Sequence, residues 1–141
     1  MKNTHKLAIV VLALAAAAGL AACKKPAPAA KKTASPPPAE LTEVRNAIQA
    51  YYGDHEGKYP ATLNELLGEG RYLKELPKVK TPGHSASNAV KYLQAKELAP
   101  ENLDDAGGYA YYNSGKYPAT MGALVLNCKH KNDEGIEEYS Y

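Results

Sequence analysis

The sequence predicts an α+β domain: an N-terminal amphipathic helix, a helix-containing loop and a C-terminal three-stranded antiparallel sheet. Two observations predict this class. Apolar residues recur most regularly at helical spacing over residues 40–52. After Gly107-Gly108, short apolar or aromatic runs alternate with Gly, Asn, Asp and Pro, a pattern typical of strands joined by turns. The domain therefore spans residues 40–141, and the residues before it differ in composition.

The first predicted helix covers residues 40–52. Pro38 precedes it, and the carboxylates of Glu40 and Glu43 favour the positive end of the helix dipole. Its apolar residues form one stripe, which comprises Leu41, Val44, Ile48, Tyr51 and Tyr52. We expect this stripe to face the core of the domain.

A second, short helix is expected after Thr62. Thr62 and Glu65 form a Thr-x-x-Glu capping box before a leucine-rich turn, and Gly68 ends the helix. Residues 78–106 carry no clear period. There the apolar residues Val90, Leu93 and Leu98 fit either a loose helix or single contacts of a long loop.

Three strands of an antiparallel meander are predicted at residues 109–112, 123–126 and 136–141. The chain has eleven Tyr but no Phe and no Trp, so its aromatic packing must be amphipathic. Strand alternation places Tyr109 and Tyr111 on one face and Tyr112 on the other. The tyrosines of the sheet either form the core or bind a small ligand or glycan; the candidates are Tyr109, Tyr111, Tyr112, Tyr139 and Tyr141.

Few residues suggest a metal site or catalysis. Asn132, Asp133 and Glu134 supply oxygens for calcium, which needs about six to eight, but their pattern favours a solvated acidic turn. Cys128 and His130 are two metal ligands without a second Cys-His pair, and a buried strand cysteine is the favoured interpretation. The sequence contains no nucleophile elbow, phosphate loop or paired-carboxylate motif. We predict no catalytic residues, no metal and no dissociable cofactor.

Residues 1–22 are predicted to be a signal peptide. Lys2 and Lys6 precede an uncharged apolar run at residues 7–20, which is shorter than the about 20 residues of a membrane span. The tetrapeptide Leu20-Ala21-Ala22-Cys23 resembles the lipobox of bacterial lipoproteins. The resemblance implies a diacylglyceryl group on Cys23, cleavage just before it, and acylation of the new N-terminus with chains such as palmitate. An ordinary secretory leader is the alternative.

Residues 23–39 are predicted to be a tether that joins the lipidated cysteine to the domain. Its Pro/Ala/Lys-rich composition favours extended polyproline II, which reaches up to about 50 Å at roughly 3.1 Å per residue. Residues 24–39 hold four lysines and no acid, whereas residues 40–141 hold all fifteen acids and eleven basic residues. The positive charge therefore belongs to the leader and the tether, and we expect no nucleic-acid partner.

Parts of the domain resemble major pseudopilins of type II secretion, which have a type IV pilin-like fold. The first block resembles the region where those proteins leave their first helix; it comprises residues 44–52, Gly57-Lys58-Tyr59-Pro60, Leu63, Leu66-Leu67 and residues 72–77. Residues 107–113 and 124–128 resemble the first two strands of their sheet. The pilin leader and the hydrophobic half-helix that builds a filament are absent, so the resemblance implies a head that does not polymerise in the usual way.

These features lead us to expect a lipid-anchored, non-enzymatic envelope protein. It would act as a protein-interaction or accessory component of a type II secretion or type IV pilus-like system, with protein partners in the envelope. In lipoproteins of two-membrane bacteria, an aspartate directly after the lipidated cysteine keeps the protein in the inner membrane. Lys24 occupies this position here, which suggests that the protein is sorted to the outer membrane. A ligand-binding or glycan-binding surface lipoprotein is the alternative. An enzyme would require a polar pocket lined by His84 or His130 with acids.

Overall fold

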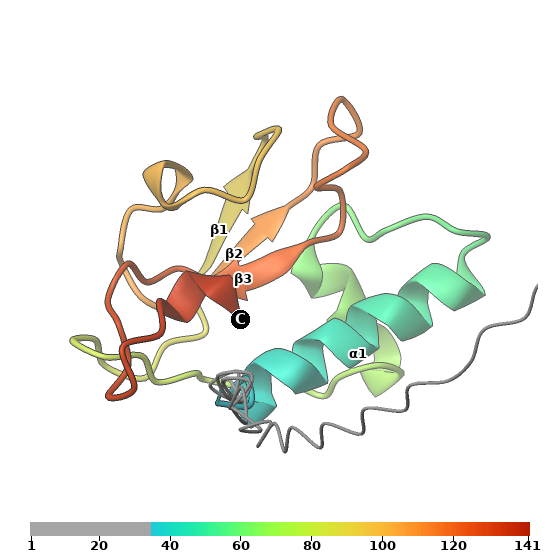
Figure 1. Ribbon diagram of the computed structural model, residues 1–141. Coiled ribbons are helices and arrows are strands. Elements are labelled where there is room, and N and C mark those ends of the chain that lie inside the picture. Colours follow the sequence, from blue (N-terminus) through green and yellow to red (C-terminus); the bar gives the residue numbers. More distant parts are fainter. Residues whose placement is uncertain (1–34) are drawn as a thin grey trace, which may run out of the picture. The chain divides into compact units, whose positions relative to one another are not determined.

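The structure is a computed structural model that describes residues 35–141 (Figure 1). Its elements are α1 (Ala39–Asp54), η1 (Leu63–Gly70), β1 (Val90–Leu93), η2 (Pro100–Asn102), β2 (Tyr109–Tyr112), β3 (Leu124–Leu126) and η3 (Glu138–Ser140), where η denotes a 3-10 helix. The α+β class is confirmed. The leader, Cys23 and most of the tether lie outside the described residues. Within residues 35–141, no helix combines the length and apolar character needed to cross a membrane.

Helix α1 confirms the first predicted helix and extends it slightly at both ends. Its buried residues are Leu41, Val44, Ala47 and Ile48, which recur at helical spacing along one face. This face packs against β3 and η1 (Figure 1). The end of the predicted stripe is different, because Tyr52 is exposed and its ring packs on that of Tyr59 at a centroid distance of 4.5 Å.

The short helix predicted after Thr62 is also present, as the 3-10 helix η1. The backbone N–H of Thr62 donates to Oε1 of Glu65 at 3.0 Å, as expected for a capping box. The Tyr51 hydroxyl donates to the other oxygen of that carboxylate at 2.6 Å, which ties η1 to α1. Leu63 and Leu66 are buried beneath this contact.

The sheet is three-stranded and mixed, with strand order β1-β2-β3. Strands β2 and β3 pair antiparallel, as predicted, and Tyr109 lies opposite Leu126. Strand β1 pairs parallel to β2 with Val90 opposite Tyr109. The central strand β2 therefore has a partner on each side, and the wholly antiparallel sheet predicted from the sequence is wrong.

The third predicted strand, at residues 136–141, is the source of this error. Oδ1 of Asn132 accepts the N–H groups of Glu134 and Ile136 at 3.0 and 2.9 Å, closing a tight turn where a strand would begin. Beyond that turn, Glu137 makes only an isolated bridge with Lys131 before η3 starts. Local turn chemistry thus removes this segment from the sheet, and β1 takes the third position.

Both faces of the sheet are buried. On one face, Tyr109 and Tyr111 pack with α1 and η1 in the main core. On the other face, Tyr112 and Val125 pack with Leu103 in a smaller core beneath the β1–β2 connection. The predicted alternation of the three tyrosines is confirmed, and β2 is buried along its whole length.

Candidate functional site

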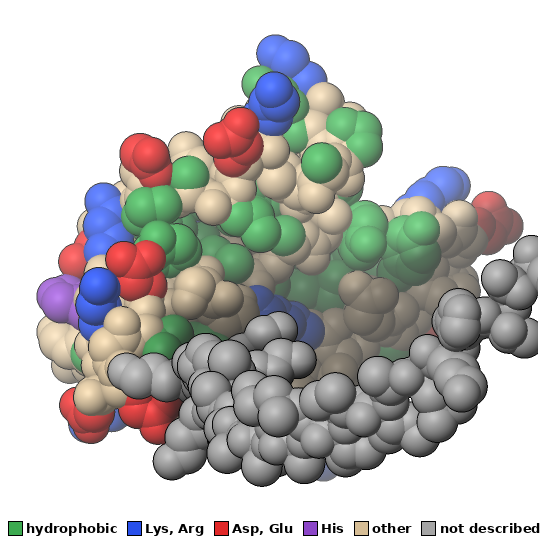
Figure 2. All heavy atoms as spheres, in the orientation of Figure 1, with side chains coloured by type: hydrophobic (Ala, Val, Ile, Leu, Met, Phe, Trp, Pro, Cys, Tyr) green, Lys and Arg blue, Asp and Glu red, His purple; other side chains and the backbone are tan. Residues whose placement is uncertain are grey.

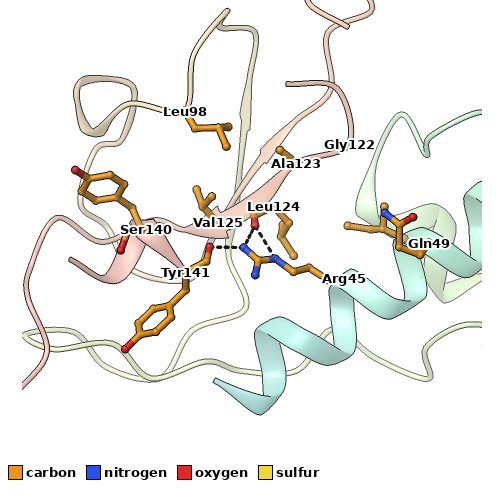
Figure 3. A pocket seen from close by; sticks show the side chains of 11 residues that line it. Arg45, Gln49, Leu98, Gly122, Ala123, Leu124, Val125, Ser140 and Tyr141 are labelled. Carbon is orange, nitrogen blue, oxygen red and sulfur yellow. Dashed lines mark hydrogen bonds between the residues drawn. The ribbon is translucent and has the colours of Figure 1, made fainter. Parts of the chain in front are cut away.

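A cleft of about 600 Å³ opens between α1 and the edge of the sheet formed by β3. Its lining includes Arg45 and Gln49 of α1, Leu124 of β3, Tyr141 beside η3, and Leu98 of the β1–β2 connection (Figure 3). In the space-filling view, the molecule is hollowed on this face and hydrophobic side chains border the hollow (Figure 2). The volume falls within the range of about 300–1,000 Å³ typical of small-molecule sites.

Arg45 joins the two walls of this cleft. Its Nε and Nη2 donate to the carbonyl oxygen of Leu124 at 3.0 and 2.7 Å, and Nη2 also donates to the main-chain oxygen of Tyr141 (Figure 3). Burial lowers the pKa of the guanidinium, which still stays charged at neutral pH. Among residues 35–141, no Asp or Glu carboxylate lies within ion-pair distance of Arg45. The cleft therefore contains a positive charge that is held by main-chain oxygens.

Three of the five candidate binding tyrosines belong to the core. Tyr109, Tyr111 and Tyr112 are at most 1% exposed, so they offer no open face to a ligand. The hydroxyls of Tyr109 and Tyr111 donate to the carbonyls of Pro77 and Pro60 at 2.9 and 2.8 Å, and burial raises the pKa of both. The other two candidates, Tyr139 and Tyr141, line the cleft. Any ligand-binding surface built from these tyrosines lies there.

The calcium candidates lie on the turn after β3. Oδ1 of Asn132 is occupied by the backbone N–H groups of the turn, and its Nδ2 donates to the Tyr141 hydroxyl at 2.6 Å. Asp133 and Glu134 are both exposed. Asn132 thus shapes the turn, as the interpretation of a solvated acidic turn requires.

The two candidate ligands Cys128 and His130 lie beside two further residues that the sequence did not connect with them. His84, Asp105, Cys128 and His130 each present a ligand atom within 4.8 Å of all the others. Only the Cys-x-His spacing is visible locally, because the loops that carry His84 and Asp105 are far away in the sequence. Both histidines therefore lie beside one acid, Asp105.

The geometry of this cluster does not suit nucleophilic catalysis. A catalytic histidine presents one ring nitrogen to the nucleophile and the other to a carboxylate. Here the same Nδ1 of His130 faces both Cys128 Sγ at 3.6 Å and Asp105 Oδ1 at 3.4 Å. Cys128 is fully buried, and burial raises the pKa of its thiol, which favours the less reactive protonated form. The side chains therefore converge on one point and do not form a nucleophile–histidine–carboxylate chain.

Comparison with known proteins identifies no relative: no family model, no curated protein and no solved structure matches the chain. The lipobox and the pseudopilin-like segments therefore stay predictions from the sequence. The mixed sheet, the cleft and the cluster are properties of the folded residues themselves.

Proposed function

We propose that this protein is a lipid-anchored, non-enzymatic, pilin-like envelope protein that acts by binding other proteins. The observation that carries the proposal is the order of segments: a charged start, an apolar run, Leu20-Ala21-Ala22-Cys23 and a proline-rich tether. The structure supports this division, because α1 begins at Ala39, where the tether ends. The residues that follow form compact cores of their own. The proposal thus describes a folded head that the proline-rich tether joins to a lipid.

The lipid anchor and the tether suggest an accessory role at the envelope. Two or more acyl chains hold a protein durably, at about 0.8 kcal/mol per buried methylene, while the tether lets the head reach up to about 50 Å. The pseudopilin-like segments around Tyr59-Pro60 favour partners in a type II secretion or type IV pilus-like system. A lipid in place of the filament-forming helix keeps the head near such a machine without making it a filament subunit.

Substitution of each cysteine tests the anchor. Cys23→Ser removes the acceptor of the lipid, so we expect this variant to leave the membrane fraction. Cys128→Ser is the matched control, because it removes the only other thiol and leaves the lipobox intact. If Cys23→Ser still fractionates with membranes after leader cleavage, the anchor assignment is wrong.

Crosslinking in intact cells tests the machinery. After pull-down of the tagged protein from envelope extracts, we expect secretin, platform or pilin components. The Cys23→Ser variant should recover fewer of them, because it is no longer held at the membrane. If repeated pull-downs contain none of these components, the link to secretion or pili is rejected even if the anchor is real.

The cleft favours a second candidate, a lipoprotein that binds a small ligand or a glycan. It combines a suitable volume with the Arg45 guanidinium, and Tyr139 and Tyr141 are among the residues that line it. Titration of the isotope-labelled protein with soluble glycan fragments tests this candidate by NMR. Shifts confined to these cleft residues would support it, and unchanged spectra at saturating glycan would exclude it.

A further inference from the structure

We propose that His84, Asp105, Cys128 and His130 form a binding site for a zinc ion. The four residues come from three separate loops: His84 from a turn before β1, Asp105 from the loop before β2, and Cys128 and His130 from the segment after β3. Their ligand atoms lie within 4.8 Å of one another. This site is distinct from the Arg45 cleft and does not depend on the proposed function.

Hydrogen bonds outside the four residues hold two of these loops together. Asn127 Nδ2 donates to Asp104 Oδ1 at 2.6 Å, and the Asp104 N–H donates back to Asn127 Oδ1 at 3.3 Å. The Gly107 N–H also donates to the Asn127 carbonyl at 2.9 Å. These contacts fix the residues next to Asp105 and Cys128, so the two side chains are positioned before any ion arrives.

Close packing brings the third loop to the same place. The ring of His130 lies over the turn that carries His84, and a Cβ atom at Gly83 would come within 3.1 Å of it. The two imidazole rings meet edge to face with centroids 5.1 Å apart. A residue larger than glycine at position 83 would therefore push the two histidines apart.

The spacing of the ligand atoms matches a tetrahedral zinc site. With Zn–N and Zn–O distances of about 2.0–2.2 Å, two such ligands lie about 3.4 Å apart at tetrahedral angles, and a sulfur and a nitrogen lie about 3.6 Å apart. The observed separations from Asp105 Oδ1 are 3.2 Å to His84 Nε2 and 3.4 Å to His130 Nδ1. Cys128 Sγ lies 3.6 Å from His130 Nδ1. These three of the six ligand separations fit a central ion, and all six are within 4.8 Å.

Hydrogen bonding explains the same arrangement poorly. Oδ1 of Asp105 already accepts the Lys129 N–H at 2.8 Å, and two imidazole nitrogens face this one oxygen as well. A carboxylate oxygen has two lone pairs, so it cannot serve three donors well. Both imidazole distances also exceed the about 2.7–2.9 Å of charge-assisted hydrogen bonds. The side chains converge more tightly than their mutual hydrogen bonds require.

The chemistry of the four ligands selects the metal. Thiolate and imidazole are poor ligands for calcium and magnesium but suit zinc. With both histidines neutral, the carboxylate of Asp105 and the thiolate of Cys128 carry two negative charges, which balance a divalent ion. The ion can enter from solvent, because 48% of the His130 side chain is exposed.

A buried hydroxyl next to Cys128 supports the site independently. Thr81 is 2% exposed, and its Oγ1 has no hydrogen-bond partner among the described residues. The next residue along the chain, Pro82, has its carbonyl oxygen 3.7 Å from Cys128 Sγ, which places the Thr81-Pro82 segment beside the sulfur. An unpaired buried donor is costly, but a hydroxyl beside a metal-bound thiolate gains a strong acceptor. Thr81 is thus placed as a second-layer donor to the sulfur.

Titration of the full chain in mild detergent tests the proposal directly. Zinc is added in competition with a chromophoric chelator, and we expect one ion to bind per chain. His84→Gln and His130→Gln should each weaken binding at least about 100-fold, since even second-layer changes cost about 10–100-fold. His55→Gln is the matched control: it removes a histidine stacked on Tyr51, outside the cluster, and should leave the affinity unchanged.

Cobalt substitution identifies the ligands and provides a second readout. We expect the strong visible bands of tetrahedral cobalt with a thiolate-to-cobalt charge-transfer band, and the charge-transfer band should be lost in Cys128→Ser. Near-ultraviolet circular dichroism of the tyrosines verifies that each variant is folded. The proposal is overturned if folded His84→Gln and His130→Gln bind zinc as tightly as the His55→Gln control. An octahedral cobalt spectrum without the charge-transfer band would overturn it as well.

Discussion

Replacing Arg45 by alanine should destabilise the head, because this side chain fastens α1 to the sheet edge. The guanidinium makes three hydrogen bonds, two to the Leu124 carbonyl and one to the main chain at Tyr141. Hydrogen bonds to charged groups contribute roughly 1.5–3 kcal/mol each, but the cleft admits water to both abandoned main-chain oxygens. We therefore expect a loss of about 2–3 kcal/mol in the free energy of unfolding, well below the sum of three bonds.

Arg71→Ala is the control for loss of an arginine. Arg71 pairs with Asp54 at 2.9 Å, yet 64% of its side chain is exposed, and such surface pairs contribute about 0–1 kcal/mol. Urea unfolding of the full chain in non-ionic detergent, followed by the near-ultraviolet dichroism of the buried tyrosines, measures both variants. Arg45→Lys should fall between them, since an ammonium cannot reproduce the planar fork. A loss for Arg45→Ala no larger than that for Arg71→Ala would show that Arg45 does not fasten α1 to the sheet.

Two further predictions concern packing and pH. A Cβ atom at Gly122, where φ is +82°, would lie 2.3 Å from the Tyr59 ring, so Gly122→Ala should lower the free energy of unfolding in urea by about 2–4 kcal/mol. Gly115 has open space around it, so the control Gly115→Ala should lower it by under about 1 kcal/mol. Equal losses would contradict the packing of Gly122 against Tyr59. Burial raises the pKa of Tyr109 and Tyr111, so the stability they contribute is complete below their ordinary pKa of about 10 and is lost as the pH rises toward the folded values. Urea midpoints measured from about pH 8 to about pH 11 should therefore fall less in the double Phe variant than in the parent chain, and equal falls would contradict the prediction.

Local sequence signals predicted the elements whose conformation is decided locally. The spacing of Leu41, Val44 and Ile48 was sufficient for α1, and the Thr62–Glu65 pair was sufficient for the start of η1. Strands β2 and β3 followed from short apolar runs. In each case the side chains that mark the element lie within it.

The errors arose where distant segments or turn chemistry decide the outcome. Strand β1 has only four residues. It pairs parallel to β2, which follows it only after a long connection that includes η2. The run at residues 136–141 resembled a strand, but the side chain of Asn132 closed a turn ahead of it. The apolar content of a run does not reveal which neighbour it will pair with.

The candidate sites divide in the same way. Cys128 and His130 were found because they are two residues apart, whereas His84 and Asp105 reach them only through loop contacts such as the Asp104–Asn127 pair. The sequence did not single out Arg45, because an arginine on the polar face of a helix is expected to point into solvent. Its hydrogen bond to Leu124 depends on the tertiary fold. A site whose residues come from several loops is therefore hard to predict from a single sequence.

The proposed function depends most on the lipid at Cys23, and the mass of the mature N-terminus tests this lipid most directly. The protein is purified from membranes in detergent and analysed intact and after digestion. We predict a chain that starts at Cys23 and carries a diacylglyceryl group and an N-linked acyl chain. A mature chain that starts at another residue, or an unmodified Cys23, would contradict the proposal that this head is held at the envelope by a lipid.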